Sequence, residues 1–383
     1  MYNIKTLNKI SPVGLAVLDP AKYAISDECE SPDAILLRSA KMHDYTFNPE
    51  LLCIGRAGAG VNNIPLDRCS EAGIVVFNTP GANARAVMEL VLCGMLMASR
   101  DVPGGMNWLG TIADDPEVAA KVEKGKSQFV GPEILGKTLG VIGMGAIGYQ
   151  VANAAVALGM TVYGYDPYLS DEFAQKLSPE VQMTDNLDEI YSQSDYLSLH
   201  APVNDKTRGM IDAAVIAQMK DGARIINMAR AELVNDDDLL AALKNGKIAR
   251  YVTDFPNPKT AAAAGVIAIP HLGASTPESE DNCALMAAEQ TREYLEHGNI
   301  KNSVNMPCVS LAPGGKTRLA VLYRKAEDIP ALVAGSGVQV ADSATEGRGD
   351  YAYSIFDLAA PADTVQIEAL RNAEGVLRVR VLG

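Results

Sequence analysis

The sequence predicts an α/β protein with a doubly wound parallel sheet, and three observations support this fold class. Short β-branched runs alternate with helical stretches rich in alanine and leucine. The runs are apolar on both faces, as are strands of a parallel sheet covered by helices. The length of 383 residues exceeds one domain at roughly 150 residues per domain. A single small module is therefore excluded.

The alternation is clearest between Lys137 and Pro270, where it follows the order of βαβ units. We expect this α/β domain to cover residues 91–282. Its predicted strands cover residues 138–143, 161–166, 195–200, 223–228, 250–254 and 265–270.

A smaller α/β domain, of flavodoxin-like class, is predicted over residues 1–90 and completed by residues 283–304. Its expected strands lie within residues 16–19, 34–40, 51–64 and 73–81. A long apolar helix over residues 84–100 leads out of it, and Pro103 with two glycines is expected to end that helix. A second helix over residues 277–297 leads back.

The C-terminal residues 316–383, here called the tail, follow a linker over residues 305–315. The end of this linker is rich in proline and glycine. The tail's order of elements is β-α-β-β-α-β, which predicts an α+β domain of ferredoxin-like class. Its position after a linker indicates regulation or oligomerisation.

Composition excludes several classes of partner. With 33 lysines and arginines against 47 aspartates and glutamates, the net charge is −14, which disfavours nucleic acid and anionic membranes. The six cysteines have no CxxC spacing, so we expect neither a disulfide framework nor a metal site. No segment has the roughly 18 uninterrupted apolar residues of a membrane span. These features predict a cytoplasmic protein.

A glycine motif indicates a dinucleotide site of Rossmann type. Gly143, Gly145 and Gly148 stand in GxGxxG spacing between a predicted strand and a predicted helix. Asp166 ends the next strand, where a carboxylate would accept hydrogen bonds from an adenosine ribose. Pro167 and Tyr168 follow it, so no cation is at hand for a 2′-phosphate. The sequence predicts NAD as the cofactor.

Five segments together resemble the D-isomer-specific 2-hydroxyacid dehydrogenases: GRAGAGVNNI, NTPGANARAVMEL, VIGMGAIG, NMARAELV and PHLGAST. They stand in the family's order and spacing over residues 1–307. The C-terminal part resembles an ACT domain in length and strand order. The resemblance implies NAD-dependent hydride transfer at C2 of a small hydroxy acid, in which an imidazole moves the hydroxyl proton.

The resemblance also implies site residues. His271 would be the catalytic histidine and Arg230 would bind the substrate's carboxylate and carbonyl, for which a planar guanidinium is suited. Asp254 would receive the nicotinamide carboxamide. The full set of implied cofactor-contacting positions is Gly143, Gly145, Ala146, Ile147, Gly148, Asp166, His200, Ala201, Pro202, Thr207, Ala229, Arg230, Asp254, His271, Gly273 and Ala274.

One position departs from the family. Relatives carry a glutamate that hydrogen-bonds the histidine, whereas this chain reads Asp254-Phe255-Pro256-Asn257-Pro258-Lys259 and has no glutamate between Glu232 and Glu278. A glutamate would stabilise the protonated imidazole, whereas a lysine would disfavour it. Asn257 and Lys259 are the two candidates for an altered catalytic partner. Impaired catalysis, in a protein that only senses NAD(H), is the alternative.

For the substrate end, the resemblance implies a phosphorylated 2-hydroxy or 2-keto acid bound by the first domain. Arg38, Ser39 and Asn83 would hold the phosphate, and the amides of Ala59 and Gly60 the carboxylate. Arg56 would bind the carboxylate or a ligand of a neighbouring subunit. An unphosphorylated 2-keto acid such as hydroxypyruvate or glyoxylate is the alternative. A homodimer or tetramer is expected. An amino-acid effector of the tail is an open question, because the usual Asn-x-Pro-Gly turn is replaced by Asp328-Ile329-Pro330-Ala331.

Overall fold

The computed structural model describes residues 1–312, 314, 317–325 and 328–383. Residues 313 and 315 of the predicted linker, and residue 316 at the start of the predicted tail, lie outside the described residues. The chain forms two compact units, one of residues Met1–Asn83 with Pro277–Gly383 and one of residues Ala84–Thr276. The predicted boundaries at residues 90 and 282 lie inside helices α3 (Ala84–Ser99) and α11 (Pro277–His297).

The first unit contains a five-stranded parallel sheet of order β2-β1-β3-β4-β5, which is the flavodoxin-like order. Its strands are β1 (Tyr2–Leu7), β2 (Tyr23–Ser26), β3 (Ala34–Leu37), β4 (Cys53–Arg56) and β5 (Val75–Phe77), and its helices are α1 (Pro12–Leu15), α2 (Leu66–Glu71) and α11. All residues of β3 are buried. The predicted smaller α/β domain is confirmed.

One predicted strand of this unit is wrong. Residues 16–19 follow α1 instead, because Ser11 and Pro12 begin a helix: the Ser11 side chain accepts a hydrogen bond from the Val13 amide and Pro12 stands in the first turn. Gly14 packs so closely on α11 that an added Cβ would lie 2.3 Å from the carbonyl carbon of Ala284. This packing partner is 270 residues away, so no local pattern indicates it.

The second unit contains a seven-stranded parallel sheet of order β12-β11-β10-β9-β6-β7-β8. Its strands are β6 (Thr138–Ile142), β7 (Thr161–Tyr165), β8 (Gln182–Met183), β9 (Tyr196–Leu199), β10 (Ala223–Asn227), β11 (Ile248–Thr253) and β12 (Val266–Ala268). Every predicted strand of this domain is present, and the strand order reverses beside β6, as in a doubly wound sheet. The Rossmann prediction is confirmed.

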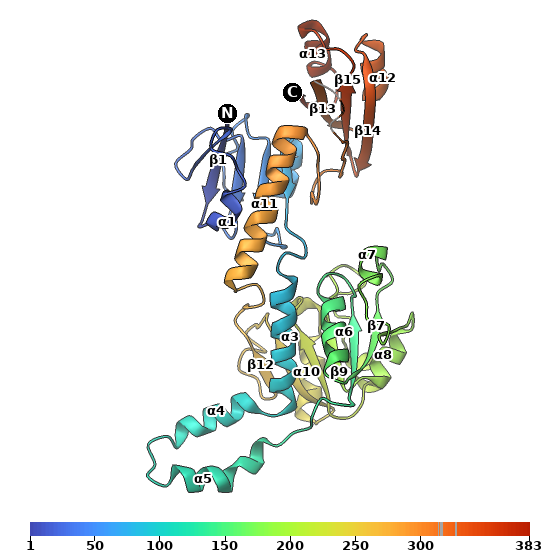
Figure 1. Cartoon of the computed structure of the whole chain (residues 1–383). Coiled ribbons are helices and arrows are strands. Elements are labelled where there is room, and N and C mark those ends of the chain that lie inside the picture. The colour runs from blue at the N-terminus through green and yellow to red at the C-terminus, as the bar shows by residue number, and fades with distance from the viewer. Residues whose placement is uncertain (313, 315–316, 326–327) are drawn as a thin grey trace. The chain divides into compact units, whose positions relative to one another are not determined.

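The helices of the second unit include an arm that the sequence did not predict. Pro103 does not simply end α3; it stands in the first turn of α4 (Val102–Thr111), and α5 (Val118–Gly125) with η1 (Lys126–Phe129) completes the arm, which projects from this unit (Figure 1). None of these three helices has a buried residue. The other helices are α3, α6 (Gly148–Ala157), α7 (Asp171–Ala174), α8 (Leu187–Gln193), α9 (Ala213–Gln218), η2 (Ala231–Leu233) and α10 (Asp236–Lys244).

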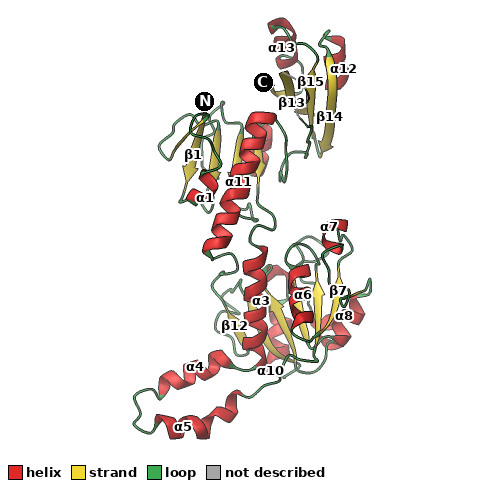
Figure 2. Ribbon diagram, viewed as in Figure 1, coloured by secondary structure: helices red, strands yellow, loops and turns green. Residues whose placement is uncertain are grey.

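The C-terminal part is a four-stranded antiparallel sheet of order β14-β15-β13-β16, as in the predicted ferredoxin-like class. Its strands β13, β14 and β15 are labelled in Figure 2. Its elements are β13 (Thr317–Arg324), α12 (Ile329–Gly335), β14 (Val340–Arg348), β15 (Tyr351–Leu358), α13 (Thr364–Arg371) and β16 (Val376–Leu382). Among the described residues, no helix is long and apolar enough to cross a membrane, and no cluster of metal-ligating side chains is found.

Candidate active site

The glycine loop of the second unit has the geometry that a dinucleotide requires. Gly143 has φ +91°, and an added Cβ would lie 2.7 Å from the carbonyl carbon of His200. Gly148 packs as closely, since its Cβ would lie 1.9 Å from the Gly143 oxygen, whereas a Cβ on Gly145 would meet open space. Gly143 thus packs on the end of the neighbouring strand and Gly148 packs on Gly143. The backbone at Gly145 is left open, so a pyrophosphate can approach it.

Asp166 follows β7 and holds this loop. Its Oδ2 accepts a hydrogen bond from the Met144 amide at 2.8 Å, and its Oδ1 accepts one from the Tyr168 amide at 2.9 Å. A carboxylate has about four acceptor positions, so two remain for ribose hydroxyls. The half-buried Asp166 therefore fits the predicted ribose partner.

His200 follows β9 at the same edge of the sheet. Its Nε2 lies 2.8 Å from Ser198 Oγ, and its Nδ1 is buried without a partner among the described residues. Burial lowers the pKa of His200 to about 4, so the ring is neutral at pH 7. Beyond it, Thr207 Oγ1 donates to the Pro202 carbonyl at 2.6 Å and fixes the turn.

Arg230 is exposed and follows β10, where a buried asparagine fixes its backbone. Asn227 is 0% exposed; its Oδ1 accepts from the amides of Ala229 and Arg230, and its Nδ2 donates to the Arg230 carbonyl at 2.8 Å. The Arg230 guanidinium donates to the Ala229 carbonyl and lies over the Phe255 ring, 5.3 Å from its centre. Sequence reasoning missed Asn227, although a polar residue inside an apolar strand was a usable signal.

His271 follows β12 on a short turn that Asp254 fixes. Asp254 is 1% exposed, and its two oxygens accept from the amides of Leu272 at 2.7 Å and Gly273 at 2.8 Å. His271 has φ +56°, a conformation that is uncommon for a residue other than glycine and that surrounding structure must hold. The predicted cofactor contact of Asp254 would thus come in addition to a structural role.

The two candidates for the altered partner of His271 bind elsewhere. Asn257 Nδ2 donates to Asp236 Oδ2 at 2.7 Å, and Lys259 Nζ lies 2.7 Å from Asp237 Oδ1. Both acidic residues belong to the first turn of α10. Within the described part of the chain, no hydrogen bond joins either candidate to the His271 ring.

In the first unit, the predicted substrate residues gather at the carboxyl ends of β3 and β4. Arg38 Nη1 lies 2.5 Å from Glu280 Oε1 of α11, a residue that the sequence analysis did not name. Arg56 donates from Nε to the Arg38 carbonyl at 3.2 Å. Gly58 lies directly beside the Arg56 guanidinium, since an added Cβ would be 1.9 Å from Nη1. This loop continues into the predicted carboxylate-binding amides of Ala59 and Gly60.

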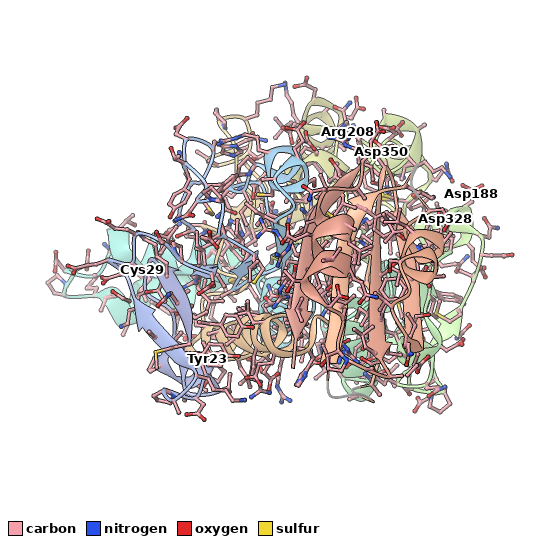
Figure 3. The ribbon with its side chains drawn as sticks, turned by 90° about the horizontal axis from the view of Figure 1, so that it is seen from above. Tyr23, Cys29, Asp188, Arg208, Asp328 and Asp350 are labelled. Carbon is pink, nitrogen blue, oxygen red and sulfur yellow. The ribbon has the colours of Figure 1, made fainter. Side chains whose placement is uncertain are left out.

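Two other predicted substrate residues, Ser39 and Asn83, lie in turns of the first unit. The Ser39 amide donates to Asn8 Oδ1 at 3.1 Å, which fixes the turn after β3, and Asn83 stands half-buried in the turn before α3. In the tail, Asp328 (labelled in Figure 3) caps α12 by accepting from the Ala331 amide at 3.1 Å. The carboxylate that replaces the usual asparagine therefore has a capping role.

Comparison with known proteins gives a family match and similar relatives that agree with the predicted NAD-binding domain. The family "D-isomer specific 2-hydroxyacid dehydrogenase, NAD binding domain" matches residues 95–273. The chain is 35% identical over 328 residues to a D-3-phosphoglycerate dehydrogenase of Methanocaldococcus jannaschii, covering 82% of this chain and 59% of the relative. It is 35% identical over 353 residues to a D-3-phosphoglycerate dehydrogenase of Synechocystis sp., covering 87% of this chain and 61% of the relative.

The chain thus spans about 60% of the length of these two curated relatives. Among solved structures, a glyoxylate reductase from Paecilomyes thermophila superposes with a TM-score of 0.63 at 25% identity, covering 79% of this chain and 98% of that chain.

Proposed function

Because the chain belongs to the D-isomer-specific 2-hydroxyacid dehydrogenase family, we propose that it oxidises D-3-phosphoglycerate to 3-phosphohydroxypyruvate with NAD, the entry step of L-serine synthesis. One observation carries the proposal: six strands of one parallel sheet end in the glycine loop, Asp166, His200, Arg230, Asp254 and His271. Ligands of such sheets bind outside the carboxyl ends of the strands.

In this proposal the protein holds the cofactor and moves one proton. The glycine loop and Asp166 would hold the dinucleotide, which when bound would supply the acceptor for the hydride of C2. The His271 imidazole takes the proton of the C2 hydroxyl as the C–O bond becomes a carbonyl. Arg230 donates to the C2 oxygen and to the carboxylate, where negative charge is greatest. In the reverse direction His271 would return the proton to the C2 oxygen, and the reduced cofactor would supply the hydride.

The phosphate end is assigned to Arg38, Ser39 and Asn83, and the carboxylate also to Arg56 and the amides of Ala59 and Gly60. The net charge of −14 makes these local cations necessary for an anionic substrate. The runner-up, a reductase of hydroxypyruvate or glyoxylate, gains support from the similarity to a glyoxylate reductase and from the Arg38–Glu280 ion pair, which occupies Arg38 without a phosphate.

Two further expectations remain proposals. Self-association to a dimer or tetramer is supported by the arm α4–η1, on and beside which Met106, Leu109 and Val130 are exposed. An amino-acid effector of the tail has less support, since the Asp328 carboxylate caps α12 and brings negative charge to the position where an amino acid's carboxylate would bind.

The test measures NADH oxidation with 3-phosphohydroxypyruvate, hydroxypyruvate, glyoxylate and 2-oxoglutarate. We expect the highest kcat/KM with the phosphorylated substrate, and a loss of roughly 100-fold or more in His271→Ala, as for removal of a general acid–base. His43→Ala is the matched control, because the exposed His43 lies 3.0 Å from the Asn62 carbonyl, outside the proposed machinery.

The other outcomes are informative as well. A higher kcat/KM with hydroxypyruvate or glyoxylate would transfer the assignment to the runner-up. NADH binding without turnover of any of the four acids would contradict both and favour an NAD(H)-sensing protein. In that case Asn257→Glu tests whether the missing carboxylate is the cause.

A further inference from the structure

The Phe255 ring lies close to both side chains to which the chemistry is assigned. It directly follows the buried Asp254 at the end of β11. Its ring centre is 4.6 Å from that of the His271 imidazole, with an interplanar angle of 51°, and 5.3 Å from Cζ of Arg230. Side chains from the ends of β10 and β12 thus contact one aromatic ring.

The contact matters because little else orients the imidazole. Asp254 fixes the backbone around His271 through the amides of Leu272 and Gly273, yet no hydrogen bond to the His271 ring is found among the residues that the structure describes. The ring of Phe255 is the aromatic partner that limits the rotation of the imidazole. The family resemblance implies a glutamate in this role, and this chain has none between Glu232 and Glu278.

The loop after Phe255 is fixed at its far end. Asn257 Oδ1 accepts from the Lys259 amide at 2.9 Å and from the Thr260 amide at 3.2 Å. The side chains of Asn257 and Lys259 are tied to Asp236 and Asp237 of α10, as described above. Phe255 is therefore held between two fixed points, the buried Asp254 and this turn.

An aromatic ring suits both neighbours. Its face carries negative potential that attracts the guanidinium, and tilted contacts between rings are favourable. The Arg230 guanidinium lies over the ring with Cζ 5.3 Å from its centre, and its N–H groups other than the one bound to the Ala229 carbonyl are left for a planar carboxylate. Once His271 has taken the substrate's proton, two cations lie next to the ring, and the negative potential of its face lessens their repulsion.

We propose that Phe255 is the positioning residue for both His271 and Arg230, in place of the family's glutamate. This inference rests on the proposed dehydrogenase function and adds to it. The ring orients the imidazole and the guanidinium without adding a charge of its own. Asn257 and Lys259 support it indirectly, through the turn that they close.

The experiment compares Phe255→Leu, which keeps an apolar side chain but removes the ring, with Phe255→Tyr, which keeps the ring. For the preferred 2-oxo acid we expect Phe255→Leu to lower kcat about tenfold and to raise KM, since the ring contacts both groups. The Kd of NADH and the melting temperature should stay unchanged. Phe255→Tyr should retain kcat within about twofold. Phe173→Leu is the matched control, because Phe173 stacks on Tyr149 at 5.5 Å.

Two results would overturn the inference. Turnover by the native chain with equal kcat and KM in Phe255→Leu would reject it while the dehydrogenase function stands. If the native chain turns over none of the acids, the proposed function fails, and the positioning role is then decided by NMR. With only four histidines, the His271 ring protons can be assigned, and they should lose a ring-current shift in Phe255→Leu. Unchanged His271 signals would reject the contact itself.

Discussion

Arg380 and Arg230 each lie over an aromatic ring, one in each unit, and they differ in what their N–H groups do. Arg380 is 8% exposed, lies 4.6 Å from the Tyr294 ring centre, and donates to the carbonyls of Tyr294 at 2.8 Å and Leu295 at 2.6 Å. Arg230 is exposed, and its one described guanidinium bond is to the Ala229 carbonyl. A buried arginine with carbonyl partners is structural, whereas one with donors left over is available to a ligand.

Structural arginines of this kind attach the C-terminal tail to the end of α11. Arg380 binds the last carbonyls of α11, which lack partners within the helix and carry negative potential. Arg318 adds a bond to the His297 carbonyl and a buried ion pair with Asp357 at 2.6 Å, and Tyr353 donates to the Gly298 carbonyl. The face of the tail's sheet opposite α12 and α13 shares one apolar core with the five-stranded sheet. We therefore expect the tail to unfold together with the rest of the first unit.

The largest effect is expected for Arg380→Met. The substitution removes two hydrogen bonds from a charged donor, while the Tyr294 carbonyl keeps the Gly298 amide and the Leu295 carbonyl keeps the Tyr2 hydroxyl. The free energy of unfolding of the first unit should fall by about 3 kcal/mol, at about 1.5 kcal/mol for each lost charge-assisted bond. Calorimetry should show a melting temperature lower by roughly 2–4 °C for each kcal/mol. Arg371→Met is the control, because Arg371 forms an exposed ion pair with Glu368 on the same tail. Equal melting temperatures in the two variants would contradict a structural role for Arg380.

The opposite pattern is expected for Arg230→Met. Because the guanidinium is exposed and has few protein partners, the melting temperature should stay within about 1 °C. The kcat/KM for the preferred 2-oxo acid should fall about 100-fold, which corresponds to about 2.7 kcal/mol of lost transition-state binding. Arg100→Met, at an exposed position of the same unit, is the control. A variant that loses stability but keeps its activity would place Arg230 with the structural arginines and break the comparison.

The sequence predicted those parts that local patterns determine. The strands of the seven-stranded sheet follow from β-branched runs, and Gly143, Gly145 and Gly148 follow from their spacing next to a strand. The arm was not predicted, because Pro103 both ends one helix and suits the first turn of the next. The attachment of Arg380 to α11 joins residues 85 and 86 positions apart, and no periodicity carries such information.

The candidate site divides in the same way. His271 and Arg230 could be named because the segments PHLGAST and NMARAELV resemble those of the family, and each residue follows a predicted strand of the parallel sheet, where functional side chains gather. The roles of Asp254 and Phe255 could not be derived, because they depend on which backbone amides and rings lie next to them across three strands. The assignment of Asn257 or Lys259 as a partner of His271 stays a prediction. In the structure both side chains instead bind acidic residues of α10.

The smallest effect concerns His200 of the second unit, a half-buried histidine without an ion-pair partner among the described residues. Burial lowers the pKa of His200 to about 4, below the ordinary 6.5, so the unfolded chain takes up the proton first as the pH falls. The stability contributed by neutral His200 is thus present above pH about 6.5 and is lost between about 6.5 and 4, with a slope of at most about 1.4 kcal/mol per pH unit.

His200 is half-buried rather than fully buried, so water screens part of its charge and we expect a loss of about 1 kcal/mol between pH 6.5 and 5. Urea unfolding followed by the fluorescence of Trp108, the single tryptophan, measures it in the unit concerned. His200→Gln keeps a polar side chain next to Ser198 and should remove this part of the pH dependence. An identical slope in both proteins would mean that His200 is already solvated when the chain is folded, and its unpartnered Nδ1 would then be an ordinary surface atom.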